Sequence, residues 1–90
     1  MAATKEGTQK RWSSIYSASY RHLLKQLKQA RLEAGLTQVQ VADALGQPQS
    51  FVSKCESGER RVDVVELGRF AELYSKPLSF FLPRDRHRGD

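Results

Sequence analysis

The chain has 90 residues and carries 15 Lys and Arg against 10 Asp and Glu, a formal net charge of +5. This length fits one domain, no apolar run approaches the roughly 20 residues of a membrane-spanning helix, and the first residues lack the apolar core of a signal peptide. A single cysteine, Cys55, excludes an internal disulfide framework and a cysteine-based zinc site. Because no nucleophile–base pair or phosphate-cradling glycine loop is visible either, we expect a cytoplasmic protein that is not an enzyme and holds no metal or cofactor.

The positive charge is unevenly distributed along the chain. Residues 20–34 hold four cations against the single acid Glu33, whereas residues 35–58 hold one lysine against two acids. A basic excess of this kind favours polyanionic partners, because its field acts on them before contact. A solvated basic helix without a partner remains the alternative, since charged helix surfaces are common.

The first third of the chain divides into an arm and a helix. Residues 1–17 are mostly small and polar and lack a helical period, which predicts a flexible N-terminal arm. Apolar residues then recur at intervals of three and four, which predicts an amphipathic helix. They are Tyr20, Leu23, Leu24, Leu27, Ala30 and Ala34. Gly35 follows and suits the left-handed conformation that ends many helices.

A second helix is predicted from Gln38 to Gly46. Thr37 and Gln40 have the spacing of a capping box, in which each side chain accepts a hydrogen bond from the other residue's backbone N–H. Val41, Ala42 and Leu45 form the inward face.

A third helix is predicted from about Pro48, which suits a first turn because its missing N–H costs nothing there, to Gly58. Steps of about 100° per residue divide this helix into two faces. One face carries only hydrogen-bonding side chains, namely Gln49, Ser50, Ser53, Lys54 and Ser57, and the opposite face carries Phe51, Val52 and Cys55. The polar face has the residue types that read base edges in DNA, but a merely solvated exterior explains it equally well at this point.

Two further elements complete the chain. Asp63 and Glu66 predict the capped start of a fourth helix, whose inward face is Leu67, Phe70, Ala71 and Tyr74. Residues 75–77 end it, residues 78–82 predict a short fifth helix, and residues 83–90 form a charged tail. With no period-two alternation, the sequence predicts a compact all-α domain of five helices over residues 18–82.

Residues 38–57 resemble the helix-turn-helix unit of the phage-repressor and Cro-like class, the XRE family. Ala42 stands where that unit needs a small residue at the helix crossing, Gly46 supplies the turn, and Val52 is the buried apolar residue of the second helix. The resemblance extends over about residues 24–82 and implies a lambda-repressor-like fold that binds double-stranded DNA in the major groove.

The resemblance also implies roles for single residues. Base edges would be read by Gln49, Ser50, Ser53 and Lys54, and phosphates would be held by Gln38, Arg60 and Arg61. Arg31 and Glu56 match a family pair that fixes the orientation of the recognition helix.

Repressors of this class bind paired half-sites as dimers, so we expect a homodimer. The apolar candidates for its interface are Tyr74, Leu78, Phe80 and Phe81, although these aromatic rings could instead close the core of the monomer. The expected function is therefore a sequence-specific transcriptional regulator, a dimeric repressor or controller protein of a phage, mobile element or restriction–modification system. The alternative is a protein-interaction adaptor, or an XRE antitoxin that binds a partner protein.

Overall fold

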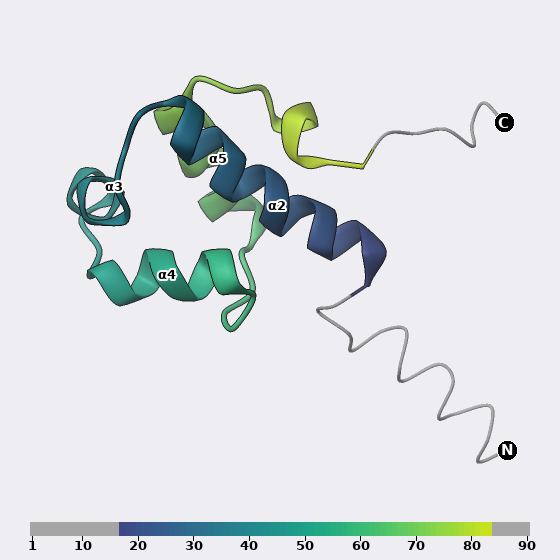
Figure 1. Ribbon diagram of the computed structural model, residues 1–90, viewed down its shortest axis with the longest axis horizontal. Coiled ribbons are helices and arrows are strands. Elements are labelled where there is room, and N and C mark those ends of the chain that lie inside the picture. The colour runs from purple at the N-terminus through teal and green to yellow at the C-terminus, as the bar shows by residue number, and fades with distance from the viewer. Residues whose placement is uncertain (1–16, 84–90) are drawn as a thin grey trace, which may run out of the picture.

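The computed structural model describes residues 17–83, which form four α-helices and one short 3₁₀ helix and contain no strand (Figure 1). The elements are α2 (Ala18–Glu33), α3 (Gln38–Leu45), α4 (Gln49–Ser57), α5 (Val64–Tyr74) and η1 (Leu78–Phe81). The all-helical class is thus confirmed for this part of the chain. The prediction of five helices is wrong in one respect, because the last segment is a 3₁₀ turn of four residues.

The helix ends follow from local side-chain chemistry. Both capping boxes are present: Thr37 and Gln40 exchange hydrogen bonds at the start of α3, and Asp63 and Glu66 do so at the start of α5. The predicted arm lies outside the described residues except for Ser17, whose Oγ accepts a hydrogen bond from the backbone N–H of Tyr20 and caps α2. The predicted tail also lies outside them, apart from Pro83.

The start of α4 differs from the prediction. Pro48 is the residue before the helix, with φ −69° and ψ 156°, rather than a member of its first turn. Its side chain has no hydroxyl or carboxylate, so α4 begins without a side-chain cap. The end of α4 does follow the prediction, because Gly58 adopts φ +88° and continues the chain away from the helix.

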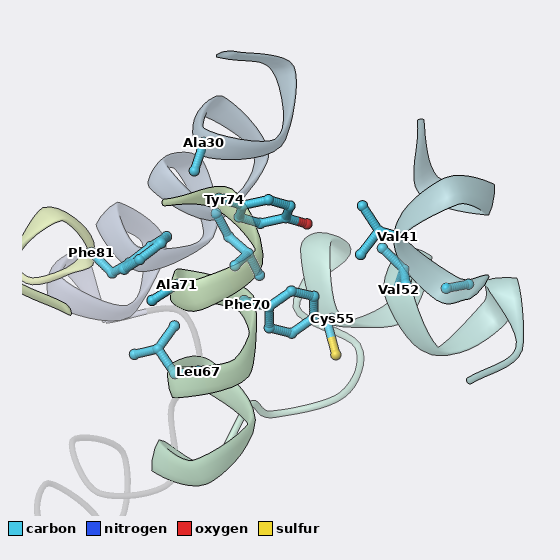
Figure 2. Close-up of a cluster of buried hydrophobic side chains, with 11 residues drawn as sticks. Ala30, Val41, Val52, Cys55, Leu67, Phe70, Ala71, Tyr74 and Phe81 are labelled. Carbon is cyan, nitrogen blue, oxygen red and sulfur yellow. The ribbon is translucent and has the colours of Figure 1, made fainter. Parts of the chain in front are cut away.

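The core is one cluster of side chains from all five elements (Figure 2). Phe70 of α5 lies between two other rings, with its centroid 6.1 Å from that of Phe51 and 5.9 Å from that of Tyr74. Figure 2 shows Phe70 and Tyr74 directed toward Cys55, Val41 and Val52 of the facing helices. Cys55 is completely buried, as expected from its place on the apolar face, and burial raises the pKa of its thiol.

Two residues of α2 form hydrogen bonds with different neighbours. Near its start, Tyr20 accepts a hydrogen bond at Oη from the backbone N–H of Val62, 3.0 Å away, in the segment before α5. Farther along, Gln26 donates to the backbone oxygen of Phe80 in η1 at 3.0 Å. These two hydrogen bonds connect α2 to the segment before α5 and to η1. None of the helices in residues 17–83 has the length and apolarity needed to cross a membrane.

Candidate nucleic-acid interface

Helices α3 and α4 are joined by a tight turn and pack directly against each other. Gly46 adopts the left-handed conformation (φ +68°) after α3, and the backbone N–H of Gln47 donates to the oxygen of Ala42 at 2.9 Å. Ala42 is almost fully buried where the two helices approach, and Val52 of α4 is completely buried. A small side chain at the first position and an apolar one at the second hold the two helices at a fixed mutual tilt.

The outer face of α4 points away from this core. Gln49, Ser50, Lys54 and Ser57 are exposed, and Ser53 is half-buried. Within residues 17–83, no hydrogen bond or ion pair engages the side chains of Gln49, Ser50 or Lys54. The hydroxyls of Ser53 and Ser57 donate to backbone oxygens one turn earlier, at 3.3 Å and 3.2 Å. At Gln49, Ser50 and Lys54 the face therefore presents donors and acceptors that are available to a ligand.

A buried ionic network fixes this face relative to α2 and α3. Nε of Arg31 lies 2.6 Å from Oε2 of Glu56, and Nη2 of Arg31 lies 3.1 Å from Oε1. The guanidinium also donates to the backbone oxygen of Leu36 at 2.9 Å, and Gln38 donates from Nε2 to Oε1 of Glu56 at 3.1 Å. The hydrogen bond to Glu56 raises the pKa of Arg31 against the effect of burial. The network thus joins α2, the loop after it, α3 and α4 at one point.

The two arginines after α4 are held by intramolecular contacts. Arg60 forms a bidentate pair with Glu66, with both N–O distances at 2.8 Å, and its guanidinium lies 4.8 Å from the ring centre of Phe51. The sequence analysis did not predict this pair. The only feature of the sequence that could have indicated it is the capping-box acid Glu66, which follows the two consecutive arginines closely. Arg61 stacks over the ring of Tyr20 at 4.5 Å and stays exposed. Arg60 is thus already neutralised by a carboxylate, whereas Arg61 is not.

The four dimer candidates do not share one surface. Tyr74 and Phe81 are buried in the core of the chain and are therefore withdrawn as interface residues. Phe80 is half-buried beneath the ammonium of Lys76, 4.6 Å from its ring centre, and Leu78 is exposed. Sequence reasoning missed Val64 and Val65, the most exposed large apolar side chains among the described residues, because they occupy the first turn of a helix and break its amphipathic pattern.

No group of three or more histidine, cysteine or acidic side chains within residues 17–83 is arranged to hold a metal ion. The acids Glu33, Glu56 and Glu66 are instead each engaged by a cation.

Comparison with protein families gives one match. The family described as helix-turn-helix domain matches residues 22–76, from the second turn of α2 to the segment after α5. Comparison with curated proteins gives no match. The matched range contains α3, the turn and α4, and a helix-turn-helix domain indicates DNA binding and transcription regulation. The chain belongs to the helix-turn-helix domain family.

Proposed function

We propose that the protein is a transcriptional regulator that recognises a specific sequence of double-stranded DNA through α4. The observation that carries the proposal is the outer face of α4, where the exposed side chains of Gln49, Ser50 and Lys54 have no partner inside the described chain. A side chain that is already free loses no internal hydrogen bond when it meets a base edge. The helix beneath it is held by the buried Arg31–Glu56 pair, so its orientation is set before DNA arrives.

Within this proposal, Gln49, Ser50, Ser53 and Lys54 read bases. Glutamine suits adenine N6 and N7, lysine donates to guanine O6 or N7, and serine serves either base. Lys54 is the strongest candidate because it is the one cation on this face and is exposed.

Phosphate contacts are assigned to Gln38, Arg60 and Arg61. Arg61 offers its charge directly, because it is exposed and stacked on a ring rather than paired with an acid. Arg60 and Gln38 share their donors with Glu66 and Glu56, so each would divide its hydrogen bonds between a carboxylate and the DNA. A guanidinium has five N–H donors, so Arg60 can hold its carboxylate with two of them and still face a phosphate.

The finer proposal is an XRE-type dimeric repressor or controller protein. A single recognition helix covers few base pairs, so two copies on paired half-sites about one helical turn apart provide the specificity. Leu78, with the accessible part of Phe80, remains the candidate contact between copies. Control by the concentration of the protein itself, or by a partner protein, would suit a phage, mobile-element or restriction–modification setting.

The experiment is selection from a random-sequence duplex pool, followed by footprinting and titration on the selected site. We expect a recovered motif with two half-sites, and Lys54→Ala should cost about 1–3 kcal/mol of binding free energy at one or two base pairs. Equal losses on selected and random duplex would contradict base reading by Lys54. Light scattering across a dilution series with and without the selected duplex tests the dimer, and only a 10.2 kDa species would remove it.

One observation favours the second candidate, a protein-interaction adaptor or antitoxin. Lys54 is the one cation on the outer face of α4, and Arg60 beside it is neutralised by Glu66. An adaptor would show no sequence preference in the selection and little dependence on salt, whereas neutralising about 5 phosphates gives a log–log salt slope near −4 to −5.

A further inference from the structure

The exposed face of α2 carries a row of cations. Arg21, Lys25 and Lys28 follow one another at intervals of four and three residues, and all three are exposed. The helix contains one acid, Glu33, and its carboxylate is paired with Lys76 at 2.6 Å. Within residues 17–83, no hydrogen bond or ion pair engages Lys25 or Lys28. The positive charges of these two lysines are therefore not compensated by any acid among the described residues.

Contacts of neighbouring residues show which flank of α2 the row occupies. Arg31 reaches Glu56 of α4, and the Cδ1 atom of Leu24 would lie 2.8 Å from a Cβ placed on Gly58, at the end of α4. At about 100° per residue, Lys28 is the next position outward from both Leu24 and Arg31. Lys28 therefore borders α4 on the solvent side of the contact between the two helices.

The other flank of α2 faces a different part of the molecule and has a different charge. Gln26 donates to the backbone of Phe80 in η1, and Glu33 pairs with Lys76 in the segment before η1. The helix thus has a cationic flank, which runs from the border with α4 at Lys28 to the solvent side at Lys25, and a neutral or acidic flank toward η1.

The segment after α4 reaches the start of α2. Arg61, in the segment after α4, lies over the ring of Tyr20 in the first turn of α2, one residue before Arg21. A cation of the segment after α4 therefore lies at the start of the helix that carries Lys25 and Lys28. The phosphates of a duplex held by α4 carry charge of the opposite sign, one per about 3.4 Å of helix axis on each B-DNA strand, and therefore attract these lysines.

We infer that Lys25 and Lys28 form a second DNA contact, in which this flank of α2 binds backbone phosphates outside the stretch of groove read by α4. The inference rests on the proposed function and extends it. Base recognition stays with α4, whose outer face carries one cation, and a large part of the electrostatic attraction comes from α2. Contacts to phosphate carry no sequence information directly, so the flank raises the affinity for every duplex alike.

The test compares Lys25→Gln/Lys28→Gln with the intact chain on the selected duplex and on a random duplex of equal length, across a salt series. Each lost phosphate contact should reduce the magnitude of the log–log salt slope by about 0.9, so the double variant should lose about 1.8. The loss of affinity should be the same factor on both duplexes. On a duplex shortened to the bases that α4 covers, the intact chain and the double variant should bind alike.

Lys28→Gln alone should reduce the magnitude of the slope by about 0.9. The control for this single variant is Lys76→Gln, because it also removes one positive charge but from the η1 flank. It should leave the salt slope unchanged, and melting curves should show all variants folded, since the substituted lysines of α2 are exposed. An equal slope change in Lys76→Gln would mean that net charge acts without contact, and this would overturn the inference. An unchanged slope in the double variant would also overturn it and leave the proposed function intact. Failure of the intact chain to bind any duplex would overturn both.

Discussion

Two arginine–glutamate pairs lie on either side of α4, and they differ in their access to water. Arg31 and Glu56 meet in the interior, with side chains 10% and 5% exposed, whereas Arg60 and Glu66 meet on the surface, with side chains 42% and 21% exposed. Both pairs are bidentate: Arg31 donates from Nε and Nη2, and Arg60 donates from Nη1 and Nη2. The pairs differ in the free-energy cost of losing one partner.

In the interior, water cannot replace a lost partner, so an unpaired charge keeps its full desolvation penalty. On the surface, water or a phosphate oxygen can take the place of the carboxylate at little cost. We therefore assign the Arg31–Glu56 pair to fixing the position of α4, and the Arg60–Glu66 pair to holding an arginine that can exchange its partner.

The largest expected effect is that of breaking the interior pair. Arg31→Met leaves Glu56 buried without its cation, which should cost about 3–5 kcal/mol of unfolding free energy. It also removes the donor to the backbone of Leu36 and releases α4 from α2. Urea denaturation measures the loss, and titration with the selected duplex should show weaker binding even where the protein is still folded.

Arg31→Met/Glu56→Gln is the control for that variant. Because it removes both charges, it should recover part of the stability that the single variant loses. A single variant no less stable than the double one would contradict the view that an uncompensated charge causes the loss.

The second effect concerns the surface pair and is read in binding. Glu66→Gln removes the charge that holds Arg60 but keeps an acceptor for the backbone N–H of Asp63, so the capping box survives. Arg60 then becomes free to contact phosphate. Every duplex should bind more tightly, and the log–log salt slope should steepen by up to about 0.9, while thermal stability changes much less than in Arg31→Met.

Glu59→Gln is the matched control for this second prediction. Glu59 is an exposed acid in the same segment, and no cation among the described residues pairs with it. The substitution removes one negative charge without releasing an arginine. If Glu59→Gln tightens binding as much as Glu66→Gln does, the gain comes from the change in net charge and not from the release of Arg60 by Glu66.

The contrast also shows what sequence alone could predict. The capping boxes and glycine ends of the helices follow from residues three or four positions apart, so they were predicted correctly. The Arg31–Glu56 pair came from the family resemblance, because nothing local connects residues 25 positions apart.

The surface contacts could not be predicted in this way. Whether Arg60 meets Glu66, or Arg61 meets Tyr20, depends on how the segment after α4 passes the start of α2. The same holds for Phe80 and Phe81: the geometry of the 3₁₀ turn places one ring beneath Lys76 and the other in the core, and their adjacent positions in sequence do not reveal which.

A third effect is smaller and separates charge from hydrogen bonding in the surface pair. The hydrogen bond from Arg60, together with that from the Asp63 backbone, lowers the pKa of Glu66. A carboxyl with a lower pKa in the folded than in the unfolded state stabilises the fold above its unfolded pKa, and this contribution fades as the pH falls through the folded value. The stability difference between the intact chain and Glu66→Gln should therefore shrink on acidification below about pH 4. A difference that stays constant from pH 6 to pH 3 would contradict this assignment.

The smallest effect lies beside the interior pair. Tyr74 is close enough to Arg31 and Glu56 for their charges to act on its hydroxyl, and burial raises the pKa of that hydroxyl. Its Oη is buried and has no hydrogen-bond partner among the described residues. Tyr74→Phe removes this unsatisfied group and keeps the ring on Phe70, so urea denaturation should show stability unchanged or raised by up to about 1 kcal/mol. A clear loss would mean that the hydroxyl has a partner, such as a trapped water shared with Glu56, and the interior network would then extend from α2, α3 and α4 to α5.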